Sequence, residues 1–555
     1  MSKADLLFKK HEELLTKACA AIQDRGHWLP YPEIPSGRIY GETAKQDGKQ
    51  AYEAALNQPF LVQGPQSQGR VGVEVSPYTG ALGISYDQYK AEDLILTAKH
   101  ALPAWRDAGP AARVGVCAEI LERLNKRSFE IGNATMHTTG QGFAMAFQAG
   151  GPHAQDRGLE AVATAWVLMS KVPNTSEWNK PQGKHDPLVM KKNYYIVPRG
   201  IAMVVACSTF PTWNTYPGLF ASLVTGNPVI IKPHSQAVLP VAITVQVCQQ
   251  VLEECGFDPC LVQMAAEGHE VGIARELATH PEIKIIDYTG GNGFGDWLSS
   301  NARQARIYKE QAGVNTVLID SLPTLKRSAQ NLAFALSLYS GQMCTTPQAV
   351  LIPKAGVATD EGWMSFAEIA AYLCETIKKF LSDPERAVGV LGAIPNSATV
   401  IRLEAAASLG KVRLASETHP VPGYAEAVYR TPLVLEVEGT DPVWQQEQFG
   451  PISFLVAVDD TEQGLQLIAE TIAKKGAITF AVYSTDEAVL DKAEQVAIEQ
   501  GVALSCNMDG GVFVNQSAAF SDFHATGNNP AANASLTDMA FVADRFAVVQ
   551  SRRHI

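Results

Sequence analysis

The chain has 555 residues, of which 46% are hydrophobic and 18% charged, so it is an ordinary globular sequence long enough for several domains. Its net charge of −12 argues against binding to nucleic acid, because nucleic-acid-binding proteins carry basic stripes. The sequence has no signal-peptide core, no apolar run of membrane-spanning length and no Cys-x-x-Cys pair, so we expect a cytoplasmic protein without a membrane partner, a zinc site or a disulfide framework.

The first sixty residues contain two predicted elements. Apolar residues recur at helical spacing over 4–24 and predict an amphipathic helix. Trp28-Leu29-Pro30-Tyr31-Pro32 follows, where the prolines exclude a long helix and the aromatic side chains indicate an extended segment packed on the body. This N-terminal extension carries no evident chemistry. A packing role is favoured over a surface for a partner, and both remain open.

From about Val71 the sequence alternates between apolar strands and helices. Buried strands are predicted at 201–206, 227–232 and 284–288, with a helix over 241–254. This alternation predicts a parallel sheet with helices on both faces and with ligands at the carboxyl ends of its strands. The pattern resumes from 310 to 505, so a second α/β domain is expected. A hairpin at 181–197 and a final strand at 546–550 complete the predicted elements.

Three short motifs stand in fixed order in the second half of the chain. Glu310 lies in Tyr-Lys-Glu-Gln-Ala-Gly, Cys344 lies in Gly-Gln-Met-Cys-Thr-Thr, and Glu447 begins Glu-Gln-Phe-Gly-Pro. They resemble the base, the nucleophile and the nicotinamide-ribose ligand of the aldehyde dehydrogenase superfamily. The gap of 34 residues (344 − 310) between the first two also matches that superfamily's usual separation. The resemblance covers roughly residues 60–555.

The resemblance implies an α/β fold of three parts after the N-terminal extension, 1–60. A Rossmann-type nucleotide-binding domain would span 61–180 and 198–309, and a catalytic domain would span 310–529. The hairpin 181–197 and the segment 530–555 would form a small β domain for oligomerisation, so a homodimer or homotetramer is expected.

The chemistry that the resemblance implies is oxidation of an aldehyde to an acid. The Cys344 thiolate would attack the carbonyl carbon, and the resulting thiohemiacetal would lose a hydride to a nicotinamide. Glu310 would then activate the water that hydrolyses the thioester. A coenzyme A-acylating dehydrogenase is one alternative, although it would not need Glu310 for deacylation. A non-catalytic scaffold on the same fold is the other.

The residue that completes the oxyanion hole departs from the superfamily pattern. An asparagine amide usually stands just before Phe-Pro, and here Thr209 occupies that position. The Thr209 hydroxyl can donate a hydrogen bond beside the backbone N–H of Cys344, although it is shorter and rotatable. Asn214, five residues further on, is the less favoured alternative for the missing amide.

The resemblance also assigns cofactor contacts. Lys232 would hold the adenosine ribose, near Ser208. Ser235, three residues after that lysine, is neutral where NAD-preferring relatives often carry glutamate, so NADP is favoured and NAD remains possible. Its alternative role is to cap the next helix. Further contacts are expected from the glycine-rich turn after the strand at 284–288, at Gly290, Gly291 and Gly295, and from Glu447 and Phe449. The twelve histidines are scattered and predict no metal site.

Within the superfamily, four stretches are similar to the PaaN family of phenylacetic acid degradation proteins: 136–141, 150–158, 209–214 and 515–527. This implies oxidation of a ring-opened, CoA-linked semialdehyde with NADP. The longer bifunctional relatives carry a C-terminal hydratase, which this chain is expected to lack. Phe520 and Phe523 stand where relatives place substrate-contacting residues. Walls of the substrate pocket and ordinary packing are equally open for these two side chains.

Overall fold

The computed structural model describes residues 2–268 and 272–555. Its first sheet contains five parallel strands in the order β11-β10-β7-β8-β9. The predicted strands at 201–206, 227–232 and 284–288 are confirmed as β7, β8 and β10 of this sheet. The five strands of this sheet are β7 (Ile201–Val205), β8 (Val229–Lys232), β9 (Val262–Met264), β10 (Ile283–Thr289) and β11 (Arg306–Glu310).

The first sheet is buried because helices cover both of its faces, as the unbroken apolar run of β7 predicts. The predicted helix over 241–254 is confirmed as α11 (Leu239–Glu254). The other helices of this part include α5 (Ala91–Asp107), α6 (Gly109–Lys126), α7 (Ser128–Thr139), α8 (Phe143–Gly150), α9 (Pro152–Met169), α10 (Thr215–Val224), α12 (Ile273–Thr279) and α13 (Asn292–Asn301).

The second sheet has seven strands in the order β17-β20-β21-β14-β12-β22-β23, and all of its pairs are parallel except that of the edge strand β17 with β20. The strands are β12 (Thr316–Ile319), β14 (Ala349–Pro353), β17 (Lys411–Leu414), β20 (Leu433–Glu438), β21 (Ile452–Val458), β22 (Thr479–Tyr483) and β23 (Ala503–Cys506). Its helices include α14 (Leu325–Ser337), α15 (Phe366–Leu381), α17 (Ser397–Ala406), α18 (Thr461–Lys475) and α19 (Glu487–Gln500).

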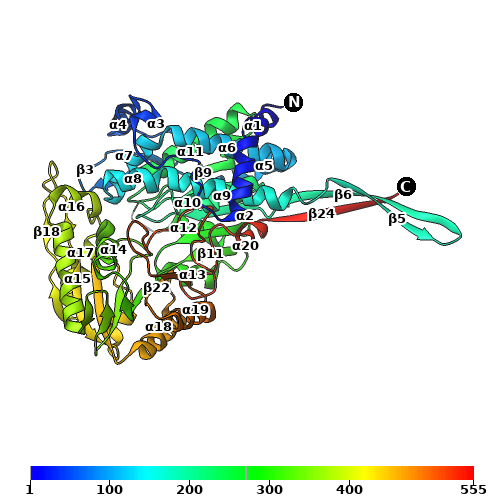
Figure 1. Cartoon of the computed structure of the whole chain (residues 1–555). Helices are drawn as coiled ribbons and strands as arrows, with labels where there is room; N and C mark the ends of the chain where they lie inside the picture. The colour runs from blue at the N-terminus through cyan, green and yellow to red at the C-terminus, as the bar shows by residue number, and fades with distance from the viewer. Residues whose placement is uncertain (1, 269–271) are drawn as a thin grey trace.

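A third, antiparallel sheet extends from the body as an arm (Figure 1). It consists of β24 (Phe546–His554), β6 (His185–Pro198) and β5 (Thr175–Gln182) in that order. The hairpin begins six residues before its predicted start at 181, because the exposed, mostly polar β5 lacks the apolar run by which the other strands were recognised. The C-terminal strand pairs with β6 over the full length of β24.

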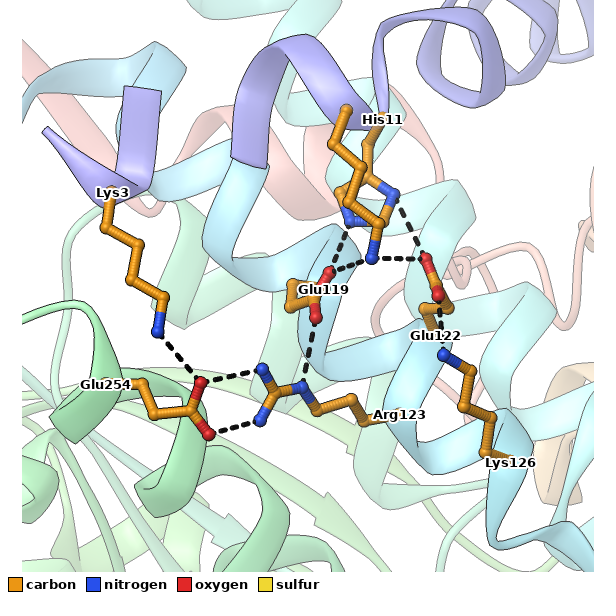
Figure 2. Close-up of polar contacts among 8 residues, drawn as sticks. Lys3, His11, Glu119, Glu122, Arg123, Lys126 and Glu254 are labelled. Atoms are coloured by element: carbon orange, nitrogen blue, oxygen red, sulfur yellow. Dashed lines mark hydrogen bonds and ion pairs between the residues drawn. The ribbon is translucent and has the colours of Figure 1, made fainter. Parts of the chain in front are cut away.

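The N-terminal segment forms two helices, α1 (Lys3–Lys10) and α2 (Glu12–Asp24), instead of the one helix predicted over 4–24. The break falls at His11, whose ring is buried against α6, with Nε2 2.8 Å from the carboxylate of Glu119. Burial raises the pKa of Glu119, but its contacts with Lys10, His11 and Arg123 outweigh burial and bring that pKa down to about 2. Figure 2 shows this network, which fastens α1 to the first domain. It also contains Lys3, Glu122, Lys126 and Glu254.

The segment after α2 is extended, as the prolines predict. The Trp28 ring lies 4.7 Å from the ring of Phe520 in an edge-on contact, and Tyr31 is buried. The aromatic side chains therefore pack this segment onto the body, in agreement with the favoured role for the N-terminal extension.

Candidate active site

The carboxyl ends of the first sheet bring several predicted site residues to one edge. Because its strands are parallel, the loops after β7, β8, β10 and β11 emerge on the same side. Ser208 and Thr209 follow β7 and are partly buried, Lys232 ends β8, and Glu310 ends β11. Residues separated by up to a hundred positions in the sequence are thereby placed along one edge of the sheet.

Cys344 lies in a loop between α14 and β14, and this loop begins in an unusual backbone conformation. Tyr339 and Ser340 both have left-handed backbones, with φ of 53° and 49°. Such a residue costs on the order of 1–3 kcal/mol and persists only where its surroundings hold it. Here the Tyr339 hydroxyl donates to the Thr139 carbonyl at 2.5 Å, and the Ser340 hydroxyl donates to the Gly392 carbonyl at 3.0 Å. The loop is therefore fixed before it reaches the thiol.

Two further contacts set the position of Cys344. The side-chain amide of Asn315 donates to the Cys344 carbonyl at 2.7 Å, while its oxygen accepts the backbone N–H groups of Ile478 and Thr479. Gly341 packs against the Glu447–Pro451 loop so closely that a Cβ there would lie 2.2 Å from the Gly450 carbonyl oxygen. Glycine is thus required in the Gly-Gln-Met-Cys motif for this close approach.

A cavity of about 520 Å³ opens in front of Cys344. Asn214, Trp213 and His524 line it together with Cys344, and so does the stretch from Asn515 to Ala519. This volume lies within the range of pockets that bind small molecules. The side chains around the thiol therefore face a site that can hold a substrate.

Glu310 and His524 lie beside the Cys344 thiol. Ligand atoms of the three residues lie within 4.8 Å of one another, and His524 Nε2 is 3.0 Å from Glu310 Oε2. Among the described residues, no donor is aligned for a hydrogen bond to either Glu310 oxygen. Burial raises the pKa of Glu310, but His524 and the Cys344 thiol outweigh burial and hold that pKa below its ordinary value. The carboxylate therefore stays ionised and can accept a proton.

The Cys344 thiol has the opposite tendency. Burial, followed by the nearby charge of Glu310, raises its pKa well above the ordinary value. The resting residue is thus a protonated thiol next to an ionised carboxylate. A proton can pass from sulfur to Glu310 as the sulfur attacks a substrate, because both groups lie in the same small cluster.

The structure favours Asn214 over Thr209 as the second oxyanion donor. Asn214 lines the pocket, and no group in the described chain accepts a hydrogen bond from its buried Nδ2. Its Oδ1 accepts a hydrogen bond from the Cys207 thiol at 3.3 Å, which orients the amide. Thr209 is not among the residues found to line the pocket, and its hydroxyl lies 3.8 Å from the Cys207 sulfur. A side-chain amide therefore lines this pocket, five residues after the expected position.

On the cofactor side, Lys232 has a partner that the sequence did not indicate. Its Nζ lies 2.6 Å from Oε1 of Glu267, and both side chains are largely buried. The loop after β9 thus places a carboxylate beside this lysine. Ser235 is partly buried in the turn after β8. The N-cap residue of α11 is Val238, so Ser235 does not cap that helix.

The glycine-rich turn after β10 divides into two kinds of position. A Cβ at Gly291 or Gly293 would meet nothing within 4 Å, and Gly291 leads into the N-terminus of α13, which no side chain in the described chain caps. Open space before exposed backbone N–H groups suits the phosphates of a dinucleotide. Gly290 and Gly295 are instead packing positions, since a Cβ there would lie 2.5 Å from the Tyr288 hydroxyl or 2.6 Å from the Gln311 amide.

Glu447 and Phe449 lie on the loop that contacts Gly341. Burial raises the pKa of Glu447 to about 7, against the opposing charge of Arg402. Arg402 also donates to the Phe449 carbonyl at 2.8 Å. The charge of Glu447 is the smallest of the causes that raise the pKa of Cys344. A ribose hydroxyl could hydrogen-bond to Glu447 in either of its protonation states.

The described lining of this pocket includes neither Phe520 nor Phe523, so it does not support pocket walls among the two roles left open for them. Phe520 is fully buried against Trp28, so ordinary packing accounts for it. Phe523 is about half exposed, with the Arg25 guanidinium 4.0 Å from its ring centre. The same stretch nevertheless supplies His524, because the loop turns its histidine, and not its aromatic rings, toward Glu310.

Four residues of the site escaped the sequence analysis or were under-weighted by it: His524, Glu267, Asn315 and Asn214. His524 stood in a stretch already singled out, but it is 214 positions from Glu310 (524 − 310), and no local pattern joins the two. Glu267 and Asn315 likewise act on residues that are distant in sequence. Asn214 was visible, and only the fold shows which of the two side chains faces the thiol.

No helix in the described part of the chain is long and apolar enough to cross a membrane. The aldehyde dehydrogenase family model matches residues 66–521. The crystal structure of an NAD-dependent aldehyde dehydrogenase from Burkholderia multivorans is 52% identical, covers 100% of both chains and superposes with a TM-score of 0.98.

More distant relatives show the same architecture. A 1-pyrroline-5-carboxylate dehydrogenase from Bacillus subtilis (strain 168) is 22% identical over 455 residues, which is 79% of this chain and 82% of the relative. The structure of a 1-pyrroline-5-carboxylate dehydrogenase from Thermus with bound NAD is 17% identical, covers 96% of this chain and 99% of that chain, and has a TM-score of 0.72, a likeness of fold alone. The chain therefore belongs to the aldehyde dehydrogenase family and is an NAD(P)-dependent aldehyde dehydrogenase.

Proposed function

We propose that this enzyme oxidises a CoA-linked semialdehyde of phenylacetate degradation to the acid, through a thioester on Cys344. The proposed chemistry is carried by Cys344, which lines the pocket with Asn214 and forms a cluster with Glu310 and His524. The substrate assignment rests on the similarity of four stretches to the PaaN family. It also draws support from one of these stretches, 150–158, which places His153 and Asp156 in the pocket wall.

In the proposed first step, the Cys344 sulfur bonds to the aldehyde carbon and its proton passes to Glu310. The carbonyl oxygen becomes an oxyanion that accepts hydrogen bonds from the Asn214 amide and the Cys344 backbone N–H. Lys232, the turn at Gly291 and Glu447 would hold the nicotinamide cofactor, which would supply the oxidant for the hydride that leaves the former aldehyde carbon. Glu310 must lose its new proton to solvent before the next step.

Deacylation then uses the same carboxylate. Glu310 withdraws a proton from a water molecule, whose oxygen bonds to the thioester carbon. The carbon–sulfur bond breaks, the acid leaves, and the thiol is restored. Release to coenzyme A would not require a carboxylate beside the thiol, so Glu310 favours hydrolysis.

A turnover screen tests this function. The purified protein would be assayed with aliphatic, aromatic and CoA-linked aldehydes, each with NAD and with NADP. We expect the acid as product and the highest kcat/KM for a CoA-linked semialdehyde. An acyl-CoA product on addition of coenzyme A would indicate the acylating alternative. No turnover of any aldehyde would indicate a scaffold.

The oxyanion assignment gives a paired prediction. Asn214→Ala should lower kcat by about a hundred- to a thousand-fold, the usual cost of removing one oxyanion donor. Thr209→Val, the matched control, should keep kcat near the wild-type value because its hydroxyl lies beside Cys207 and outside the pocket lining. Steady-state kinetics of the two variants decide between the residues, since the reverse pattern would restore Thr209 to the role expected from the sequence.

His524 yields a prediction on pH. With His524→Gln, the burial of Glu310 is opposed less, so the pKa of its carboxyl should rise. Activity requires the ionised carboxylate, which is lost as the pH falls through this pKa. The acid limb of the kcat/KM profile should therefore move to higher pH. His280→Gln, which changes a histidine outside the pocket lining, is the control. An unmoved acid limb in His524→Gln would separate His524 from the carboxylate's titration.

The structure also bears on the choice of cofactor. The preference for NADP, argued from the neutral Ser235, stays an untested prediction. If Lys232 contacts the adenosine ribose, Glu267 at 2.6 Å from its ammonium would repel a 2′-phosphate. We therefore infer a preference for NAD, which the name of the Burkholderia multivorans relative also supports.

Glu267→Gln should raise kcat/KM for NADP by about tenfold or more, with little change for NAD. The reason is that removing one close like charge stabilises the bound 2′-phosphate by roughly 1.4 kcal/mol, which corresponds to a factor of about ten. Measuring both cofactors with both proteins checks this. A wild-type enzyme that already uses NADP better would contradict the inference from Glu267 and support the one from Ser235. Ser235→Glu is the complementary variant, and it should weaken NADP more than NAD.

We also propose that the third sheet mediates assembly into a homodimer or homotetramer. The arm of β5, β6 and β24 projects from the body (Figure 1), and it exposes the apolar side chains of Tyr195, Val548 and Val549. Exposed apolar groups on a projecting sheet favour burial against a second copy. All nine cysteines are unpaired in the described chain, which fits the proposed cytoplasmic location.

A further inference from the structure

The pocket that holds Cys344 is lined in part by the N-terminal extension. His27, Leu29 and Glu33 belong to its wall, although they precede the matched family region, 66–521. A segment that only packed on the core would bury its side chains there, and the pocket would be lined by residues of the two α/β domains alone. The extension is thus part of the substrate-binding surface.

This wall is held in place at two points. Helix α1 is fastened to α6 and α11 by the network in Figure 2, in which Lys10 Nζ lies 2.6 Å from Glu119 and Lys3 Nζ lies 2.9 Å from Glu254. After α2, Trp28 packs on Phe520 and Tyr31 is buried. The segment that reaches the pocket is therefore anchored both before it and within it, as a preorganised binding surface requires.

The first turn of α9 contributes the facing polar groups. His153 Nε2 lies 2.8 Å from Glu33 Oε2, and this ion pair joins α9 to the N-terminal extension across the pocket wall. Asp156, one turn further along α9, also lines the pocket and is only 1% exposed. Both residues lie in the stretch 150–158, for which the catalytic chemistry has no use.

Asp156 is incompletely satisfied. The backbone N–H of Tyr31 lies near this carboxyl, but neither oxygen has a hydrogen-bond partner with aligned geometry among the residues that the structure describes. A buried polar group without partners costs about 1–3 kcal/mol, and native proteins keep few of them. A leucine would avoid this cost. The Asp156 carboxyl therefore keeps hydrogen-bonding capacity that a ligand in this pocket can use.

The protonation state of Asp156 indicates the chemistry of such a ligand. Burial raises its pKa well above the ordinary value, despite the opposing effects of the Tyr31 backbone N–H and the Arg157 charge. The resting group is thus a neutral carboxylic acid, which offers one O–H donor and one carbonyl acceptor. An amide presents the complementary acceptor and donor, and it brings no charge into a buried site.

We propose that Asp156, with the Glu33–His153 pair at its side, forms a subsite that binds an amide group of the substrate, remote from the aldehyde that reacts at Cys344. This inference rests on the proposed function and deepens it. The amide could belong to a free ω-amide or to the pantetheine arm of a CoA thioester. In both cases the same hydrogen bonds recognise it, and the N-terminal extension acts as a specificity element.

Matched substrates test the subsite. An ω-oxoacyl N-acetylcysteamine thioester carries one amide, and the S-pentyl thioester of the same acid has equal length without it. A straight-chain aldehyde and its ω-amide form a second pair, which distinguishes a free amide from a pantetheine-type one. For wild-type enzyme we expect kcat/KM to favour the amide of at least one pair by about 10- to 100-fold, the range for a buried hydrogen bond.

Three variants locate the effect. Asp156→Leu should reduce the amide preference to near one while kcat/KM for the partner without an amide changes little, and its Tm should not fall, since an unsatisfied buried group is removed. Asp156→Asn should keep part of the preference, because it retains a donor and an acceptor. Glu33→Gln should weaken the preference for the amide substrate. It should leave folding unaffected, because Glu33 lies at the partly exposed end of the pocket wall.

Asp24→Asn, on the exposed face of α2, is the control and should behave as wild type. Absence of an amide preference in the wild-type enzyme, or its full persistence in both Asp156→Leu and Glu33→Gln, would overturn the subsite. If Asp156→Leu fails to fold, the amide preferences of Glu33→Gln and Asp156→Asn decide whether the subsite exists. Failure to oxidise any aldehyde, with or without an amide, would overturn the proposed function instead, so the two failures are distinguishable.

Discussion

Cys344→Ala is expected to abolish aldehyde oxidation while leaving cofactor binding intact. The loss should be at least about a thousand-fold, because removing the nucleophile of a covalent mechanism costs on the order of 10³–10⁶ in rate. Steady-state turnover and a fluorescence titration with the dinucleotide measure the two properties separately. The cofactor contacts inferred here come from Lys232, Glu267, the turn at Gly291 and the loop of Glu447, and none of them requires the thiol.

Cys344→Ser should be nearly as inactive, since an alcohol is much less ionised than a thiol and the Cys344 site already disfavours the anion. Cys506→Ala is the matched control, because Cys506 is an exposed cysteine at the end of β23. If Cys344→Ala kept more than a small fraction of wild-type turnover, the nucleophile would have to be another group. Cys207, whose thiol hydrogen-bonds to Asn214, would then be tested first.

Glu310→Gln is expected to separate the two halves of the reaction. Hydride transfer precedes hydrolysis, so a single turnover should still give a burst of reduced cofactor of about one equivalent per active site, as covalent enzymes blocked in deacylation do. The burst should be slower than in wild type, because the thiol has lost the carboxylate beside it. Steady-state turnover should fall by about 10²–10⁴, the usual contribution of a general base.

Stopped-flow absorbance of the reduced nicotinamide measures both phases of the Glu310→Gln reaction. Loss of the burst together with the steady state would make Glu310 indispensable for activating the thiol, which is a stronger role than we assign. An unchanged steady state would remove Glu310 from the mechanism. Glu282→Gln, which alters a partly exposed carboxylate paired with Lys99 just before β10, provides the control for general charge effects.

Much of the fold could be predicted from the sequence because its core strands are unbroken apolar runs. β7, β8 and β10 are buried on both faces, and such strands stand out against the amphipathic helices between them. The exposed strand β5 had no such pattern and was missed. The break at His11 was also missed, since it depends on Glu119, a residue of another helix.

Of the candidate-site residues, those in local sequence motifs could be predicted, and those that act through distant contacts could not. Cys344, Glu310 and Glu447 were recognisable because each lies in a short motif whose neighbours are also constrained, such as Gly341 and Asn315 around the thiol. Glu267 and His524 could not be found in this way, because each acts through a single contact with a residue far along the chain. The choice between Thr209 and Asn214 required the direction in which each side chain points, which the sequence does not specify.

The approach of Gly341 to Gly450 has a consequence for how this enzyme can change. The two backbones meet with no room for a side-chain carbon between them, so the loop bearing the thiol and the loop bearing Glu447 and Phe449 form one rigid unit. A shift of either loop must displace the other. The reactivity of the sulfur and the grip on the nicotinamide half of the cofactor therefore cannot be adjusted independently, and new specificity is more easily acquired at the far wall, where the N-terminal extension can vary without moving either loop.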